Sequence, residues 1–282
     1  MTTATTSRFS RRYFLRLVLA SGAAVAANGV WATLVEPHWL AVERVDVPLP
    51  RLPRALDGLT IAQLSDLHRS PFVSDDMIRA AVDTANALAP HLAVITGDYV
   101  YHDVELAVDC ARELARLQAP LGRFAILGNH DHWTDARFVT RALEDAGVPV
   151  LINRAVPLER DGARLWLAGI DDVWERHHDL PRALRDVPGG ECTLLLAHEP
   201  DYADEAASFP VDLQLSGHSH GGQVNFPFIG PQTLPYLGTK YVAGLNYAGR
   251  LPVYTNRGTG TIAPAVRWNC RPEVTLLTLR AG

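Results

Sequence analysis

Ile61-Ala62-Gln63-Leu64-Ser65 runs directly into Asp66-Leu67-His68, and the rest of the chain repeats this pattern. A short apolar run of strand length ends in side chains that can bind metals or move protons. Comparable runs recur along the sequence, with helical patterns between the earlier ones. The runs cover residues 59–64, 91–96, 123–127, 164–168, 193–197, 213–216, 252–255 and 274–279. Such alternation predicts an α/β core with mixed sheets.

Three segments between the earlier runs have the pattern of amphipathic helices. Ser74 can cap the first of them, whose first turn is acidic. Residues 104–117 form a similar pattern. Residues 134–146 are expected to run from a cap at Thr134 to a stop at Gly147. Because no internal repeat or low-complexity linker interrupts the sequence, we expect these elements to form one domain.

Polar clusters stand where five of the apolar runs end. In open α/β sheets ligands bind beyond the carboxyl ends of the strands, so the clusters are expected to meet at one edge. Taken singly, most of these clusters are weak signals. Asp-x-His or Gly-Asp can be a simple turn, and a lone histidine is often a core residue. Histidines two residues apart, however, point to the same side of an extended segment. The clusters are Asp66-Leu67-His68, Gly97-Asp98, Gly128-Asn129-His130-Asp131-His132, His198 and Gly217-His218-Ser219-His220-Gly221-Gly222.

The composition limits the classes of fold and site. A chain of 282 residues with 48% hydrophobic and 20% charged residues has ample material for a core, which excludes disorder and a multi-span membrane protein. Eleven histidines against three cysteines and two methionines indicate a metal site of nitrogen and oxygen ligands. Three cysteines allow one disulfide at most, which excludes a disulfide scaffold.

The charges are distributed unevenly along the chain. Arg8, Arg11, Arg12 and Arg16 are the charged residues of the first 35, so removing their four positive charges from the net −5 leaves the remainder at −9. An acidic body is a poor binder of nucleic acid, which is therefore not an expected partner. It can act on a phosphate if metal cations supply the positive charge.

The first 35 residues have the pattern of an export signal. Ser10-Arg11-Arg12-Tyr13-Phe14-Leu15-Arg16 precedes nineteen uncharged residues, and it resembles a twin-arginine signal, an address that the twin-arginine export machinery reads. Ala24-Val25-Ala26 offers a cleavage site, while nineteen uncharged residues approach the roughly 20 that span a bilayer. Cleaved signal and retained anchor both stay open. We predict that residues 1–35 are this signal or anchor, and that residues 36–282 are a domain in the periplasm, in the cell wall or facing outward from the membrane.

The five clusters, in this order, resemble the motifs of the calcineurin-like metallophosphoesterase family: D-x-H, G-D, G-N-H-(D/E), H and G-H-x-H. The resemblance covers about residues 42–280. It implies that the domain is a four-layer α/β/β/α sandwich of two mixed sheets. The twin-arginine pattern and a C-terminal stretch resemble the exported YkuE-type branch of the family. That stretch runs from Gly221-Gly222-Gln223-Val224 through Arg257-Gly258-Thr259-Gly260 to Arg271-Pro272-Glu273.

The resemblance implies that two divalent metal ions bind at the cluster edge. Neutral imidazole suits Zn, Fe and Mn, whereas carboxylate and amide oxygens suit harder ions including Mn, so all three metals stay open. One ion would be held by Asp66, His68 and His220, the other by Asn129, His198 and His218, and Asp98 would bridge them.

The implied activity is hydrolysis of phosphodiester or pyrophosphate bonds, by in-line attack of a hydroxide shared between the two ions. His130 would be a general acid or transition-state stabiliser, or else a histidine positioned by Asp131. An envelope location makes a lipid or cell-envelope phosphate a candidate substrate. The alternative is a non-catalytic metal-binding envelope protein that retains the fold. A metallo-β-lactamase-like enzyme would need a compact H-x-H-x-D-H run, which the sequence lacks.

Some positions depart from the family pattern. Many relatives carry a second acid where this chain has Tyr101, so His102 or Asp103 is expected to orient the proposed acid instead. His132 and Trp133 are equally open to a substrate contact or to a packed turn.

Two apolar segments follow the last motif: Phe226-Pro227-Phe228-Ile229 and Leu234-Pro235-Tyr236-Leu237. They either form a rim for a lipid or the membrane, or they pack as a lid over the sheet edge. His177-His178 is expected in a solvated loop.

Overall fold

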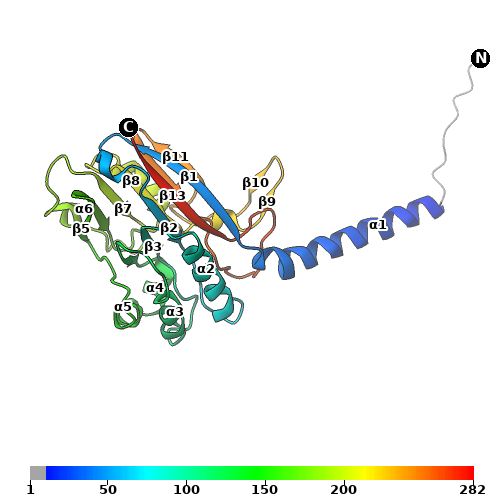
Figure 1. Cartoon of the computed structure of the whole chain (residues 1–282). Coiled ribbons are helices and arrows are strands. Elements are labelled where there is room, and N and C mark those ends of the chain that lie inside the picture. The colour runs from blue at the N-terminus through cyan, green and yellow to red at the C-terminus, as the bar shows by residue number, and fades with distance from the viewer. Residues whose placement is uncertain (1–10) are drawn as a thin grey trace, which may run out of the picture.

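Two β-sheets lie at the centre of the molecule (Figure 1). The computed structural model describes residues 11–282; Arg8 and Ser10 of the N-terminal pattern lie outside these residues. The strands of the two sheets are β1 (Ala41–Leu49), β2 (Thr60–Leu64), β3 (Leu92–Thr96), β4 (Arg123–Ile126), β5 (Arg154–Arg160), β6 (Ala163–Gly169), β7 (Thr193–Leu196), β8 (Leu213–Ser216), β11 (Gly244–Ala248), β12 (Leu251–Thr255) and β13 (Glu273–Ala281). The first sheet has the order β1-β13-β2-β3-β4, and the second has the order β11-β12-β8-β7-β6-β5. A separate short hairpin joins β9 (Asn225–Phe226) to β10 (Gly230–Pro231).

Helices cover the outer faces of both sheets. The helices are α1 (Arg11–Val30), α2 (Asp75–Ala87), α3 (Leu106–Leu114), α4 (Asn129–Thr134), α5 (Ala136–Asp145), α6 (Leu180–Leu184) and α7 (Ala203–Ala206). Short π and 3₁₀ turns are η1 (Trp31–Val35), η2 (Glu36–His38), η3 (Arg54–Leu56), η4 (Pro200–Tyr202) and η5 (His220–Gly222). Residues of α2, α3 and α5 pack on the first sheet, while α6, η4 and α7 pack on the second.

Alternation along the buried strands explains the layers. Successive side chains of a strand point to opposite faces. On β2, Ala62 packs under the helices while Ile61 enters the core between the two sheets. On β3, Ile95 and Val94 divide in the same way. The expected four-layer α/β/β/α sandwich of two mixed sheets is confirmed.

The expected strands all coincide with observed ones, but three strands of the two sheets were missed. Those three are β1, β5 and β11, which lie at sheet edges. On β1, exposed and buried positions alternate, and charged residues such as Glu43 and Asp46 interrupt the apolar run. Edge strands bury less apolar surface than central ones, so a search for continuous apolar runs passes over them.

Two helix starts were predicted with different success. Ser74 caps α2 as expected, because its hydroxyl accepts a hydrogen bond from the Met77 amide. The predicted cap Thr134 is wrong. Thr134 is the last residue of α4, and Asp135 caps α5 by accepting from the Phe138 amide at 3.0 Å. Asp135 is the cap because its extended backbone separates α4 from α5.

Parallel pairing brings the polar clusters to one edge. β2, β3 and β4 are mutually parallel in the first sheet, as are β7, β8 and β12 in the second. The carboxyl ends of these strands therefore face the same way within each sheet, and the two sheets are stacked. The loops after β2, β3, β4, β7 and β8 carry the five clusters.

Helix α1 projects away from the body (Figure 1). None of its residues is buried, and the continuous helix Arg11–His38 has a window with mean hydropathy of 1.6, enough by length and composition to cross a membrane. Glu36 and Pro37, by contrast, are buried against the body. The division of the chain at residues 35 and 36 stays a prediction.

Replacing the observed cap tests the start of α5. We expect Asp135→Ala to lower the free energy of unfolding by about 1 kcal/mol, since the Phe138 amide loses its acceptor. Asp135→Asn keeps an accepting oxygen and should remain close to the wild type. Urea denaturation followed by circular dichroism measures both. Equal stability of Asp135→Ala and the wild type would show that the cap is dispensable.

Candidate metal centre

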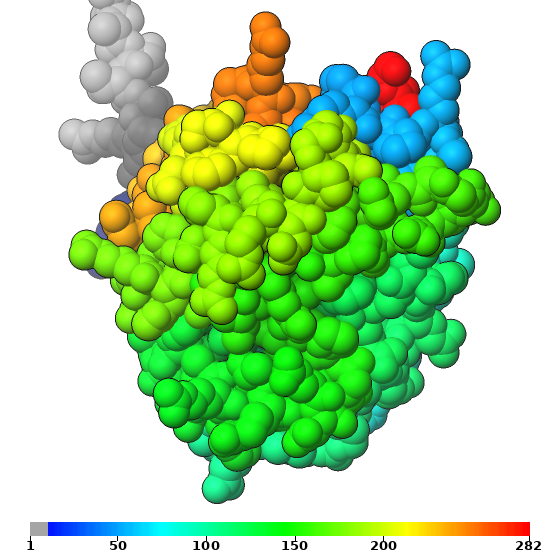
Figure 2. Space-filling model, turned by 90° about the vertical axis from the view of Figure 1, so that its left-hand side faces the viewer, coloured from blue at the N-terminus to red at the C-terminus, as the bar shows by residue number. Residues whose placement is uncertain are grey.

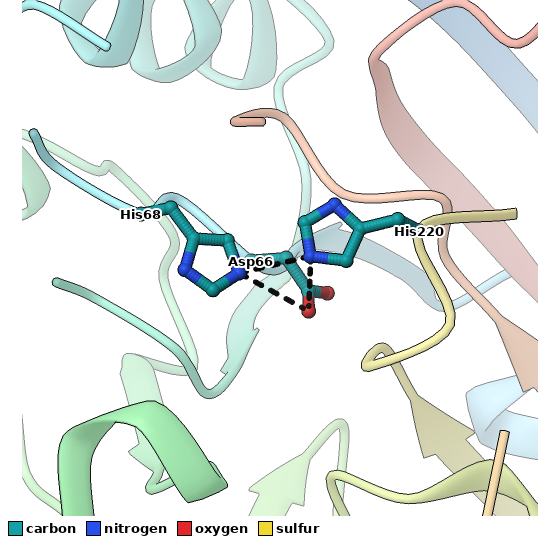
Figure 3. Close-up of side chains that lie close together, drawn as sticks. All are labelled: Asp66, His68 and His220. Atoms are coloured by element: carbon teal, nitrogen blue, oxygen red, sulfur yellow. Dashed lines mark hydrogen bonds and ion pairs between the residues drawn. The ribbon is translucent and has the colours of Figure 1, made fainter. Parts of the chain in front are cut away.

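Asp66, His68 and His220 converge at the edge between the sheets (Figure 3). The first two lie in the loop after β2, and His220 lies in the loop after β8. The two imidazole Nε2 atoms are 2.9 Å apart. Asp66 Oδ1 lies 3.4 Å from Nε2 of His220 and 4.0 Å from Nε2 of His68. Three donor atoms from distant segments thus face one point.

A second group forms around Asp98. Its Oδ2 lies 3.2 Å from Nε2 of His198, and His218 belongs to the same cluster of candidate ligands. The same Oδ2 lies 3.5 Å from Nε2 of His68, a member of the first group. Asp98 therefore stands between the two groups.

Asn129 completes the set of expected ligands. It lines the same pocket as Asp98 and His218. Its Oδ1 is buried and has no hydrogen-bond partner within residues 11–282. A buried amide oxygen without a partner is costly, so an unmet acceptor here fits a bound cation. The structure thus brings together every predicted metal ligand, and their role as ligands stays a prediction.

Burial keeps three of the histidines neutral. It lowers the pKa of His218 to about 3 and holds the pKa values of His68 and His220 well below the usual imidazole range. A neutral imidazole presents a lone pair, which is the form that binds a metal. The donor set therefore suits divalent cations.

The carboxylates respond differently to the same burial. Burial raises the pKa of Asp66 to about 6. Burial also acts to raise the pKa of Asp98, but the attraction of His198 and His130 outweighs it and holds that pKa well below the usual value. Asp98 is therefore ionised at neutral pH, which suits a bridging ligand. For His198, burial opposes the charged form, yet Asp98 raises its pKa well above the usual value.

Backbone carbonyls orient two of the imidazole rings. Nδ1 of His198 lies 2.6 Å from the carbonyl oxygen of Thr96, and Nε2 of His218 lies 2.8 Å from that of Tyr236. Each ring nitrogen that faces a carbonyl must carry the hydrogen. The opposite nitrogens are then the ones that can bind a cation: Nδ1 of His218 keeps its lone pair, and at Nε2 of His198 a cation would replace the proton that Asp98 favours.

Strained backbone underlies the site. Several of the candidate ligands have positive φ, in the left-handed region that costs a non-glycine residue about 1–2 kcal/mol. Hydrogen bonds between the loops hold them there: the Asp66 amide donates to Gly97 O and the His68 amide to Asp98 O, each at 3.0 Å. The candidate ligands with positive φ are Asp66 (φ 50°), His68 (φ 47°), Asp98 (φ 60°), His218 (φ 69°) and His220 (φ 53°).

Two glycines allow the loops to approach this closely. A Cβ on Gly97 would lie 2.7 Å from Nδ1 of His198, and its φ of +97° already disfavours any other residue. A Cβ on Gly128 would collide with the Asp98 carboxylate and the His198 ring. Glycine is therefore required at these positions of the second and third motifs, because a Cβ atom at either one would collide with its neighbours.

Asp131 joins these two loops. Its buried carboxylate accepts hydrogen bonds at 2.9 Å from the amides of Asp98, Tyr99 and Gly128. Burial raises its pKa to about 7. The alternative in which Asp131 positions the His130 ring has no support here, because this carboxylate accepts hydrogen bonds from backbone amides.

His130 lies at the border of the site and the pocket. Its amide donates to Asp98 Oδ1 at 2.9 Å. Its Nδ1 lies 3.3 Å from the carbonyl oxygen of Tyr101, and the two rings stack with centroids 5.2 Å apart. The expected partners His102 and Asp103 are not its hydrogen-bond partners among the described residues. The residue in the place of the second acid, Tyr101, orients the ring through its main chain.

His132 and Trp133 follow the third motif, and the sequence left both open to a substrate contact or a packed turn. His132 pairs with Asp171 at 2.8 Å and stacks on the exposed His177, so it belongs to a packed turn. Trp133 lines the pocket, and its indole nitrogen donates to Glu175 Oε1 at 2.7 Å. Only Trp133 is placed for a substrate contact.

Arg267 supports the site and carried no signal in the sequence. Its side chain is fully buried and donates to the carbonyl oxygens of Arg257 at 2.8 Å and Gly260 at 2.6 Å. The Gly260 amide in turn donates to Asp66 O at 2.8 Å. Arg267 therefore fastens the loop that braces the first strained ligand.

A pocket of about 380 Å³ opens beside the two groups of ligands. Asp98, Asn129 and His218 line its polar end. The rest of its wall is largely apolar and includes a tryptophan that sequence reasoning passed over, Trp174. The apolar part of the wall contains Trp133, Trp174, Val224, Leu234, Pro235, Ile262, Ala263, Pro264 and Val266.

Comparison with known proteins identifies the class. Residues 59–222 match the family of calcineurin-like phosphoesterases. The chain is 34% identical to the uncharacterized metallophosphoesterase YkuE of Bacillus subtilis (strain 168), over 97% of this chain and 99% of that protein. It is also 34% identical to the phosphodiesterase YaeI of Escherichia coli (strain K12), over 96% and 99% of the two chains. UDP-2,3-diacylglucosamine pyrophosphatase LpxG of Chlamydia trachomatis is 27% identical, over 73% and 77%.

The chain belongs to the calcineurin-like metallophosphoesterase family and is a metal-dependent phosphoric ester hydrolase. Its relatives of the YkuE and YaeI type match it from end to end. The family uses a centre of two metal ions, and this chain has candidate groups of metal ligands.

A single methyl group at Gly128 tests the close approach of the loops. We expect Gly128→Ala to push the Asp98 carboxylate and the His198 ring apart and to lower metal affinity by about 10–100-fold, as a disturbed metal environment does. Gly189→Ala is the matched control, since a Cβ there meets nothing within 4 Å. Isothermal titration with Mn²⁺ gives the affinities. Unchanged binding in Gly128→Ala would contradict the steric argument.

Proposed function

We propose that the protein hydrolyses phosphodiester or pyrophosphate bonds outside the cytoplasm with a pair of divalent metal ions. The observation that carries the proposal is the position of Asp98, whose Oδ2 lies 3.2 Å from His198 Nε2 and 3.5 Å from His68 Nε2. One carboxylate oxygen thus reaches both groups of ligands, as a bridging ligand must. Asp66, His68 and His220 would hold one ion, and Asn129, His198 and His218 the other.

The metal pair supplies what the acidic body lacks. Two ions of Mn, Fe or Zn would neutralise the charge of the phosphate and make a water-derived nucleophile available at neutral pH. The chain's own residues hold the donor atoms in place: the carbonyls of Thr96 and Tyr236 orient His198 and His218, and the loop amides restrain the strained backbone.

His130 is our candidate for the general acid. With Nδ1 directed at the Tyr101 carbonyl, its Nε2 is the nitrogen free to act on substrate. The ring lies in the pocket lining beside Trp133, with ring centroids 4.7 Å apart. A proton from Nε2 to the leaving oxygen would allow the bond to phosphorus to break.

The apolar pocket wall supports a substrate with an apolar group beside its phosphate. Leu234 and Pro235 line the wall, as a rim for a lipid would. LpxG, one of the relatives, is named as a pyrophosphatase of UDP-2,3-diacylglucosamine, a lipid-bearing substrate. We therefore propose a lipid or cell-envelope phosphate as the substrate class.

The N-terminal segment supports an envelope location. The Arg pair at residues 11 and 12 precedes the apolar part of α1, which is long enough for a signal or an anchor. We propose export by the twin-arginine machinery, with the domain in the periplasm, in the cell wall or held outside the membrane by α1.

Removal of the shared carboxylate separates an enzyme from a metal-binding envelope protein. We expect Asp98→Ala to lower hydrolysis of bis-p-nitrophenyl phosphate with added Mn²⁺ by about 10²–10³-fold or more, the usual cost of losing one electrostatic stabiliser. Asp103→Ala, an exposed acid nearby, is the control and should keep its activity. Equal rates in Asp98→Ala and the wild type, or no hydrolysis by either, would support the non-catalytic alternative.

The role of His130 has a separate signature. We expect His130→Ala to lose about 10²–10⁴-fold in kcat, the usual contribution of general acid catalysis. Its metal content, measured by plasma mass spectrometry, should stay equal to that of the wild type. His132→Ala, which removes a neighbouring imidazole paired with Asp171, should keep its turnover. Near-normal turnover of His130→Ala would remove the assignment.

A further inference from the structure

We propose that the β9–β10 hairpin and three tryptophans beside it form a surface that rests on a lipid bilayer. This tryptophan cluster consists of Trp31, Trp39 and Trp268. The bilayer is the one that α1 enters, so the body would lie against the membrane and not hang from a flexible tether. The contact itself does not depend on any enzymatic activity.

The direction of the bilayer is given by α1. The nineteen uncharged residues 17–35 would extend about 28 Å at a rise of about 1.5 Å per residue, close to the roughly 30 Å of a hydrocarbon core. Arg11, Arg12 and Arg16 precede them, and basic residues stay on the cytoplasmic side. Trp31 lies near the other end of this stretch and Trp39 follows it, in the region where aromatic side chains occupy the membrane interface. The body then emerges on the outer surface.

The hairpin exposes apolar side chains on the same side of the body. Phe228 is fully exposed, Ile229 is 73% exposed and Phe226 is 44% exposed. Of the two alternatives left open for residues 226–229, packing as a lid is therefore wrong for the hairpin tip. Figure 1 shows β9 and β10 on the side of the body from which α1 leaves. Because these side chains lie beside a helix long enough to cross a membrane, the lipid bilayer is the apolar environment that they can contact.

Direct contacts hold the hairpin to the end of α1. The amide of Asn225 donates to Trp268 O at 2.9 Å, and the rings of Phe226 and Trp268 lie 5.3 Å apart. The indole nitrogen of Trp268 donates to Asn28 Oδ1 of α1 at 3.2 Å. Hairpin, cluster and helix end therefore form one continuous surface.

The cluster has the composition of a membrane interface. Trp31 and Trp39 are 40% and 49% exposed, and their rings meet edge to face with centroids 5.7 Å apart. The Arg271 guanidinium lies over the Trp39 ring at 3.9 Å, which places a positive charge where lipid phosphates would lie. A groove of about 440 Å³ separates these tryptophans from Pro227 of the hairpin. It is large enough for a lipid headgroup.

Other faces of the body lack such a surface. The side opposite α1 is formed by the middle of the chain (Figure 2). Away from the pocket and this surface, the large exposed hydrophobic residues of the body are few, and such residues are ordinary on a protein surface. Among the described residues these are Val42, Phe72, Val108, Ile152, Tyr236 and Tyr247.

The same hairpin connects the bilayer to the pocket. Val224 precedes it and Gln232 follows it, and both line the pocket, as do Leu234 and Pro235. If the proposed phosphoesterase function holds, on which this step rests, the apolar pocket wall continues into the membrane surface. A lipid-borne phosphate could then reach the ligands without its apolar part crossing water.

A fluorescent label at the hairpin tip tests the contact without any assay of activity. Phe228→Cys can be labelled selectively with an NBD group, because Cys110, Cys192 and Cys270 are buried. Tyr247→Cys, on an exposed aromatic of β11 that pairs opposite Pro252, is the matched control. The full chain is reconstituted through α1 into vesicles of phosphatidylethanolamine and phosphatidylglycerol.

We expect the label at residue 228 to shift its emission to the blue and to be quenched by doxyl-labelled lipid. The label at residue 247 should be quenched by aqueous iodide instead. If both labels respond to iodide alike and neither responds to doxyl lipid, the surface does not rest on the bilayer and the proposal is overturned.

A double variant tests the link with the pocket. Phe228→Ser with Ile229→Ser changes the tip and no pocket-lining residue, so hydrolysis of soluble bis-p-nitrophenyl phosphate should stay at the wild-type rate. Hydrolysis of hexadecyl p-nitrophenyl phosphate embedded in the vesicles should fall severalfold. Equal loss on both esters, or no loss on the embedded one, would contradict delivery from the membrane. A wild type that hydrolyses neither ester would refute the phosphoesterase proposal, while the labels would still decide the contact.

Discussion

The Asp98 carboxylate is the contact on which the rest of the site depends. One of its oxygens lies near imidazoles of both ligand groups, and the other accepts the amide of His130 at 2.9 Å. Such a position requires the loop after β3 to pass between the loops after β2 and β4. Gly97 and Gly128 permit that passage because they have no side chain, and Asp131 secures it through three buried amides. The stacked sheets supply the framework that makes this crowding stable.

The centre is held under strain by its surroundings. Left-handed backbone at five ligand positions is costly and persists where other contacts outweigh it. Hydrogen bonds between loops supply part of the restraint, and the buried guanidinium of Arg267 supplies another part through the loop that braces Asp66. Burial also keeps the imidazoles of His68, His218 and His220 neutral. Fold, strain and electrostatics thus favour the same arrangement, in which nitrogen and oxygen donors converge.

The pocket and the N-terminal helix lie on two sides of the same group of loops. Residues on either side of the β9–β10 hairpin line the pocket, while its tip is exposed beside the end of α1. Trp133 and Trp174 line the same pocket, and their rings meet edge to face. The pocket therefore combines candidate metal ligands with a largely apolar wall.

The sequence alone determined the family of this protein and its candidate site residues. Each motif stands at the end of a buried parallel strand, and such ends meet at one edge, so the candidate ligands and His130 could be predicted before their contacts were known. Tertiary structure alone decided what supports them. Arg267, Trp174 and the Tyr101 carbonyl act through neighbours remote in sequence or through main-chain atoms, which no side-chain pattern records. The cap at Asp135 and the exposed hairpin tip were likewise set by packing, because an apolar segment reads the same in sequence whether it is covered or left bare.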